Sequence, residues 1–217
     1  MTIVENINSV RRPRGRPRAF DRNVALGAAA TTFWRLGYEG ASITDLTTAM
    51  GITPQSLYAA FTSKADLYRE ALAWYQANVG AFTAQVLRDD PDIVAAFERV
   101  LVESARQFSL PDRPHGCMIS TATLTCASEN AAIAQHVASL RRDALVLFHD
   151  RIEQGIASGV LRPDTDADVL SRYLGAIIQG MSVQAKDGAS EDELLGIARI
   201  ASVELARHGV VQTKATL

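Results

Sequence analysis

The sequence predicts an all-α protein of about nine helices, in which a small three-helix domain with a helix-turn-helix precedes a larger helical domain. Three observations predict this fold class. Apolar residues recur at helical spacing, and strand-like alternation of useful length is absent from the sequence. Glycines and capping residues mark short helices between residues 21 and 63. The seven prolines leave long stretches of helical periodicity in the remainder.

Composition is that of an ordinary globular protein, with 217 residues, 47% hydrophobic and 21% charged. No run of about 18 apolar residues occurs, so we expect no membrane span. The first residues lack the apolar stretch of a secretory signal. We therefore expect a cytoplasmic protein.

Charge is distributed unevenly along the chain. Residues 1–66 hold 8 basic and 5 acidic residues, whereas residues 67–217 hold 14 and 19. Six of the eight basic residues are arginines between Arg11 and Arg22. We predict a flexible basic arm over 1–18, a helix-turn-helix domain over 19–66 and a helical body over 67–217. A basic end on an acidic body suits contact with a polyanion, although a solubilising tail would look the same.

The first helix is expected over Asp21–Leu36, with Asp21 as N-cap and Gly37 as a left-handed C-terminal cap. A second, short helix starts at the capping box Ser42–Asp45 and ends at Gly51. Thr53 then caps a third helix. Two short helices around a tight turn, braced by a longer helix before them, form a helix-turn-helix.

The third helix has Pro54 at its first position, where the missing N–H costs nothing, and continues to Phe61. Ser63 caps a fourth helix. The apolar positions that we expect to form the small core are Ile43, Leu46, Ala49, Ile52, Leu57 and Phe61. The side chains left facing outward can enter a major groove and approach base edges; they are Thr53, Pro54, Gln55, Ser56, Tyr58 and Ala59.

These residues carry a family resemblance. The resembling positions are Phe33, Gly37, Tyr38, Ser42 to Leu46, Met50 to Thr53, Leu57, Tyr58, Phe61 and Lys64. Over residues 19–70 the sequence closely resembles the DNA-binding segment of TetR-type (tetracycline-repressor-like) regulators. The resemblance implies an operator-binding homodimer, in most members a repressor, that a small-molecule ligand releases from double-stranded DNA.

The resemblance also implies roles for single residues. Ser42 stands where a phosphate contact is usual, and Thr44 is shorter than the groove-reaching residue common at its position. Gln55 becomes the best candidate for base readout, because its amide can pair with adenine. Tyr58 and Lys64 match phosphate-anchoring positions, although Tyr58 could be a half-buried core ring and Lys64 a solvated lysine.

The arm contains Pro13-Arg14-Gly15-Arg16-Pro17, which resembles the core of an AT-hook. Glycine permits close approach to the groove floor, and arginines favour the negative potential of a narrow minor groove. We therefore expect Arg14 and Arg16 to enter the minor groove beside the operator, with Arg18 also contacting DNA. The alternative is a tail that makes loose phosphate contacts.

In the body we expect helices over 91–109, 116–127, 130–158, 164–185 and 190–208, with a loop over 110–115. The last two are expected to form a four-helix bundle across a two-fold axis. The residues predicted to make this dimer interface are Leu170, Leu174, Ile178, Leu194, Ile197, Ala201 and Leu205.

A ligand cavity is implied by the resemblance, and bulky residues of the body could line it, although any of them could be ordinary core. The candidates are Trp74, Phe97, Phe108, Met118, Phe148, Tyr173, Ile177 and Met181. Their lack of charge favours an apolar or aromatic ligand. Cys117 and Cys126, nine residues apart in one expected helix, are too distant for a disulfide and are predicted to be packed thiols.

Two other functions fit parts of the sequence. A helical-bundle enzyme is disfavoured, because the four histidines form no Glu-x-x-His pair and no phosphate-binding or nucleophile motif is present. We expect no catalytic residue, cofactor or metal. An architectural protein that only coats DNA is the second alternative, and a body of about 150 residues is large for that role.

Overall fold

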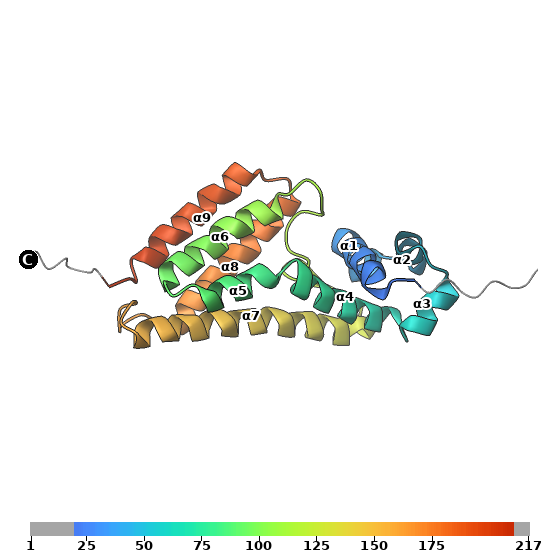
Figure 1. The fold of residues 1–217 in the computed structure, drawn as a ribbon, viewed down its shortest axis with the longest axis horizontal. Coiled ribbons are helices and arrows are strands. Elements are labelled where there is room, and N and C mark those ends of the chain that lie inside the picture. The colour runs from blue at the N-terminus through green and yellow to red at the C-terminus, as the bar shows by residue number, and fades with distance from the viewer. Residues whose placement is uncertain (1–19, 211–217) are drawn as a thin grey trace, which may run out of the picture.

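The computed structural model describes residues 20–210, which form an elongated, all-helical molecule (Figure 1). The α-helices are α1 (Arg22–Gly40), α2 (Ile43–Met50), α3 (Pro54–Ala60), α4 (Lys64–Asn78), α5 (Ala81–Asp89), α6 (Ile93–Phe108), α7 (Ala131–Ala157), α8 (Ala167–Lys186) and α9 (Glu191–Ala206). A short 3-10 helix, η1 (Ser128–Asn130), precedes α7. Among the described residues, the one β-type contact is an isolated bridge between Leu161 and Gly209.

The predicted caps of the first helices are confirmed. The Asp21 carboxylate accepts from the N–H groups of Asn23 and Val24, and Ser42 and Asp45 form a reciprocal capping box on α2. The Thr53 hydroxyl caps α3, with Pro54 at its first position. Each cap satisfies backbone donors that a helix start leaves free, so the local sequence fixes these three helix starts.

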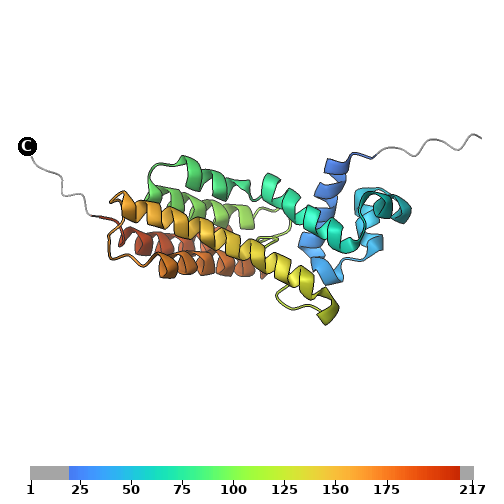
Figure 2. The same cartoon turned by 90° about the horizontal axis from the view of Figure 1, so that it is seen from below.

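Helices α1–α3 lie at one end of the molecule, and α7 runs along the body toward them (Figure 2). Their core contains Phe33, Leu46, Leu57 and Phe61, but also Ile133 of α7. The predicted core differs in one position, since Ala49 is exposed and Met50 is buried instead. A second core joins α6, α8 and α9 to the distal half of α7.

The helix predicted over 116–127 was wrong. Residues 109–127 run through turns and irregular backbone, with left-handed φ values of 75° at Gly116 and 45° at Thr123. Arg141 of α7 donates to the carbonyl oxygens of Ile119 and Ala122, at 3.1 and 2.9 Å, which replaces the amide donors that a helix would supply. A helix that the sequence did not predict, α5, follows α4 after a break at Val79–Gly80.

No helix among residues 20–210 has the length and apolar character needed to cross a membrane. Cys117 and Cys126, now on this irregular segment, are both free thiols.

Candidate nucleic-acid interface and effector cavity

The exposed face of α3 is the central feature of the DNA-binding end. Leu57 is fully buried against the first core, whereas Pro54, Gln55, Tyr58 and Ala59 are exposed. The Tyr58 ring is 51% exposed, which argues against the core role considered from the sequence. The face is uncharged and combines one amide and one phenol, groups that can hydrogen-bond base edges or phosphates.

The two hydroxyl caps are occupied within the protein. Thr53 Oγ1 accepts from the Ser56 N–H and lies 3.0 Å from Ser56 Oγ. Ser42 Oγ accepts from the Asp45 N–H and donates to Asp45 Oδ2 at 2.6 Å. The hydrogen bonds that the Asp45 carboxylate accepts from the Ser42 hydroxyl and from the Ser42 backbone N–H hold its pKa below its usual value. A phosphate at Ser42 would therefore meet a nearby carboxylate, while Thr44, beside it, is free and exposed.

Lys64 begins α4 at the same end of the molecule. Its Nζ lies 4.7 Å from the centre of the Tyr38 ring, and burial lowers the pKa of its ammonium. The cation sits at a helix N-terminus, the end that attracts anions. Lys64 is therefore not a freely solvated lysine, and its surroundings suit a phosphate.

Arg14, Arg16 and Arg18 lie outside the described residues. Arg22, the last arginine of the basic stretch, pairs with Glu70 of α4 at 2.6 Å and covers the Phe61 ring at 4.7 Å. Arg22 therefore braces α1 against α4.

A carboxylate links α1 to the body. Glu39 Oε1 accepts from the Ala127 N–H at 3.1 Å and from the Asn130 side-chain amide at 2.8 Å. The hydrogen bond from Asn130, followed by that from Ala127, lowers the pKa of Glu39. The end of α1 is thus tied to the segment that leads into α7.

A cavity of about 170 Å³ lies in the body, and Trp34 of α1 forms part of its wall. Two of the eight predicted pocket residues, Phe108 and Phe148, line it. The aromatic residues that sequence reasoning missed are Trp34 of α1, Tyr75 of α4 and Phe82 of α5. Trp34 and Tyr75 fall on apolar helix faces, where periodicity does not distinguish a cavity wall from ordinary core.

The other six predicted pocket residues lie elsewhere. Trp74 packs on Gly27 and donates its indole N–H to Asn23. Phe97, Met118 and Met181 are buried in the two cores. Tyr173 and Ile177 pack at the margin of the second core, and Tyr173 also lines a groove on the outer face of α8 and α9.

The predicted dimer residues need a similar correction. Leu170, Leu174, Leu194, Ala201 and Leu205 are buried within one protomer. They pack the second core, so they are covered before any partner arrives. Ile178 and Ile197 are half-buried, and Ile178 lines the cavity described above. The large apolar side chains exposed on α8 and α9 are instead Val169, Val183, Ile200 and Val203.

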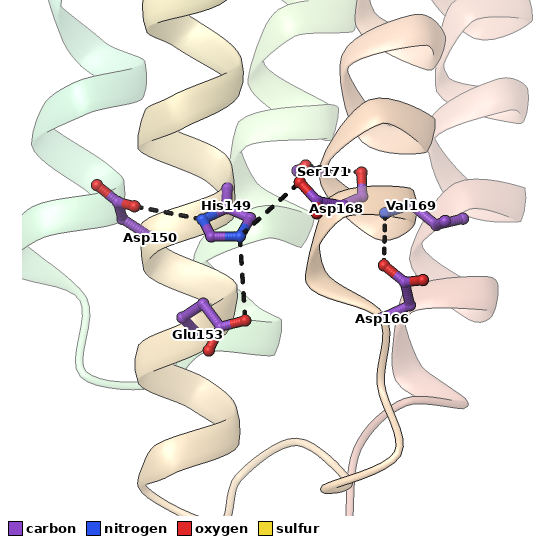
Figure 3. A network of polar contacts seen from close by, with 7 residues as sticks. All are labelled: His149, Asp150, Glu153, Asp166, Asp168, Val169 and Ser171. Atoms are coloured by element: carbon purple, nitrogen blue, oxygen red, sulfur yellow. Dashed lines mark hydrogen bonds and ion pairs between the residues drawn. The ribbon is translucent and has the colours of Figure 1, made fainter.

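His149 of α7 lies among three carboxylates, as Figure 3 shows. Its Nδ1 is 3.3 Å from Asp150, and its Nε2 is 4.0 Å from both Glu153 and Asp168 of α8. In its protonated form the imidazole would form ion pairs with these carboxylates. Within residues 20–210, no group of three or more His, Cys, Asp or Glu side chains is placed to hold a metal ion.

Comparison with known proteins bears directly on this arrangement. A model of the bacterial regulatory proteins of the tetR family matches residues 25–71, and a tetracyclin repressor-like C-terminal domain model matches residues 94–194. The HTH-type transcriptional repressor ComR of Escherichia coli is 33% identical over 195 residues, covering 89% of this chain and 93% of ComR. The chain belongs to the TetR family of transcriptional regulators.

Other relatives agree. The repressor BdcR of E. coli is 31% identical over 188 residues, covering 86% of this chain and 90% of BdcR. A cysteine mutant of the TetR family regulator CifR, solved with a 26-bp double-strand operator DNA, is 41% identical with a TM-score of 0.84. That match covers 87% of this chain and 98% of CifR. The TetR family assignment made from the sequence is therefore confirmed, and with it the regulatory, non-enzymatic class.

Proposed function

We propose that this TetR family regulator binds a near-palindromic operator as a homodimer, represses transcription and is released by a small apolar or aromatic molecule. The observation that carries the proposal is the exposed, uncharged face of α3, held by buried Leu57 on a capped helix-turn-helix. ComR and BdcR are described as repressors, and CifR was solved on operator DNA, which supports the same role here. Such a protein acts on DNA in the cytoplasm.

We assign base readout to Gln55, with Thr44, Thr53, Pro54 and Ser56 at the groove edge. Tyr58 and Lys64 are assigned to phosphates on either side. Tyr58 is exposed and carries a phenol donor, and Lys64 carries an ammonium donor at a helix N-terminus. Ser42 is assigned a lesser phosphate contact because Asp45 already occupies its hydroxyl.

The domain boundaries between residues 18 and 19 and between residues 66 and 67 stay predictions, and α4 crosses the second of them.

The arginine arm is assigned to the flanks of the operator. The described part of the DNA-binding end has few basic side chains, and α3 has none. Non-specific affinity for DNA comes mainly from neutralised phosphates. Arg14, Arg16 and Arg18 therefore have to supply much of it, in the minor groove or on the backbone.

The proposed dimer interface lies on the outer face of α8 and α9. A groove of about 670 Å³ there is lined by the exposed apolar residues Val169, Ile200 and Val203 together with Tyr173 and Arg199. A two-fold axis through this face would bring the same apolar residues of the two protomers together. Dimerisation would then cover apolar surface that the protomer leaves in water.

Binding to DNA upstream of the chain's own gene, measured by fluorescence anisotropy in moderate salt, tests the proposal. The full chain is expected to bind one fragment in strong preference to a shuffled sequence of equal length. Equal affinity for both fragments would favour the architectural alternative, and no binding would contradict the proposal.

A further inference from the structure

The effector cavity is shared between the DNA-binding helices and the body. Trp34 of α1 forms part of its wall, together with Phe148 of α7 and Gly175 of α8. Tyr75 of α4 also lines the cavity and packs against Trp34 in a T-shaped arrangement, with ring centres 5.0 Å apart. A molecule in this cavity would therefore touch α1, which packs directly on the helix-turn-helix.

Trp34 has an unused hydrogen-bond donor. Its side chain is 5% exposed, and its indole N–H has no hydrogen-bond partner within residues 20–210. The chain's second tryptophan, Trp74, is more exposed, yet its N–H is bonded to Asn23 at 2.9 Å. Buried donors without partners are rare in native proteins, and the face of the Tyr75 ring is only a weak acceptor.

The charges around the cavity narrow the chemistry of its ligand. Among the described residues that line it, Arg141 alone is charged and none carries a carboxylate. One terminal nitrogen of Arg141 is already bonded to two backbone carbonyls. The remaining polar lining is neutral and includes Gln76, Ser104, Gln107 and Gln179. A cation would find no counter-charge here, whereas an acceptor oxygen would find a donor.

The indole nitrogen of Trp34 is closed to solvent in this structure. We propose that the effector is a small, uncharged molecule of about one ring with an acceptor oxygen, and that a small rotation of the Trp34 side chain lets this oxygen accept its indole N–H. The cavity of about 170 Å³ fits this size, since an engineered apolar cavity of about 150 Å³ binds benzene. Because Trp34 belongs to α1, such a ligand acts on the DNA-binding helices without an intervening relay. The inference rests on the proposed function and names the ligand class of the same regulator.

Indole N–H signals in a ¹H–¹⁵N spectrum of the full chain without DNA test the proposal, because the sequence has only two tryptophans. Trp34→Phe and Trp74→Phe assign the two signals. Acetophenone, the probe, is expected to move the Trp34 signal downfield and to leave the Trp74 signal in place. Ethylbenzene is of similar size but lacks the oxygen, and it should give no such downfield shift.

Calorimetry supplies the second measurement. Acetophenone is expected to bind about two- to twelvefold more tightly than ethylbenzene, the range for one net hydrogen bond. Trp34→Phe should abolish this preference, whereas Trp74→Phe, the matched control outside the cavity, should retain it. Equal binding of both probes, a preference that survives Trp34→Phe, or tighter binding of benzoate than of acetophenone would overturn the proposal.

Failure here can be told apart from failure of the proposed function. If the full chain binds its operator but shows no preference between the two probes, the ligand class is wrong and the regulator stands. If no operator is bound, the proposed function itself fails, whatever the probes do.

Discussion

At the start of α4, two effects act against the charge of Lys64. Burial lowers the pKa of its ammonium, and the helix N-terminus repels a cation. The Tyr38 ring, 4.7 Å away, and the nearby Glu39 carboxylate act in its favour. A phosphate at this position would be favoured by both the ammonium and the helix end.

Gln55 and Lys64 should differ in how their removal affects DNA binding. Gln55→Ala is expected to relax discrimination at one base position by about 1–3 kcal/mol. Lys64→Ala should weaken binding to all sequences similarly. It should also reduce the steepness of the plot of log binding constant against log salt concentration by about 1. Anisotropy titrations on single-base operator variants at several salt concentrations make the comparison. A sequence-selective loss with Lys64→Ala would contradict the assignment.

The Asp45 carboxylate should make α2 sensitive to acid. Its pKa is lower in the folded protein, chiefly through hydrogen bonds from Ser42. The ionised carboxylate therefore stabilises the folded protein, and this contribution is fully present above the pKa of Asp45 in the unfolded chain. It is lost as pH falls through the folded pKa, below about pH 4. The Tm difference between wild type and Asp45→Ala should be present at pH 7 and disappear in this acid range.

Thr48→Ala, an exposed change on the same helix, is the control and should give a difference that does not vary with pH. An Asp45→Ala difference that persists unchanged to low pH would show that the capping box is not the cause.

At the scale of elements, the helix-turn-helix depends on its turn. Gly51 ends α2 with φ of 66°, and a Cβ built there meets nothing within 4 Å. Backbone conformation alone therefore favours glycine here, since left-handed φ disfavours a Cβ.

Gly51→Ala should lower the free energy of unfolding by about 1 kcal/mol or slightly more, and Gly51→Asn by less, because asparagine tolerates this conformation. Urea unfolding followed by circular dichroism measures both. Equal losses for Ala and Asn would point to a cause other than φ.

Local signals explain which elements could be predicted from the sequence. Asp21, Ser42 and Thr53 each bond to backbone groups two or three residues away, so their caps are readable without the fold. The segment 116–127 depends on Arg141, about 20 residues further on, and its irregular course could not be read locally.

The site was predicted unevenly for the same reason. Exposure of Gln55 and Tyr58 follows from helical period around buried Leu57. By contrast, Phe97 and Phe108 are alike in sequence, and only three-dimensional packing places Phe108 in the cavity wall and Phe97 in the core. The dimer residues were misplaced because Leu194 and Ile200 lie on the same helix, and periodicity alone does not say which face meets the protomer's own core.

At the scale of the whole molecule, the DNA-binding end is joined to the body through more than the chain itself. Glu39 bonds to the segment before α7, and Ile133 of α7 packs in the first core. A change in the body can therefore reach α1 by several contacts.

The proposed interface is tested by one exposed residue. Ile200 of α9 is 71% exposed, and Ile200→Asp should place a charge in the dimer interface and convert the dimer to monomer with the helical content unchanged. Val24→Asp, at a residue 68% exposed on α1, is the matched control and should stay dimeric. Light scattering after size-exclusion chromatography measures the molar mass of both variants. A dimeric Ile200→Asp protein would place the interface elsewhere.

Hydroxyl-radical footprinting of the full chain on the DNA upstream of its own gene tests the central claim most directly. A dimer with two recognition helices should protect two symmetry-related half-sites, whose centres lie about one helical turn or a multiple of it apart. Gln55→Ala should weaken this pattern at the preferred sequence. Continuous protection without a preferred sequence, or a single unpaired half-site, would contradict the account.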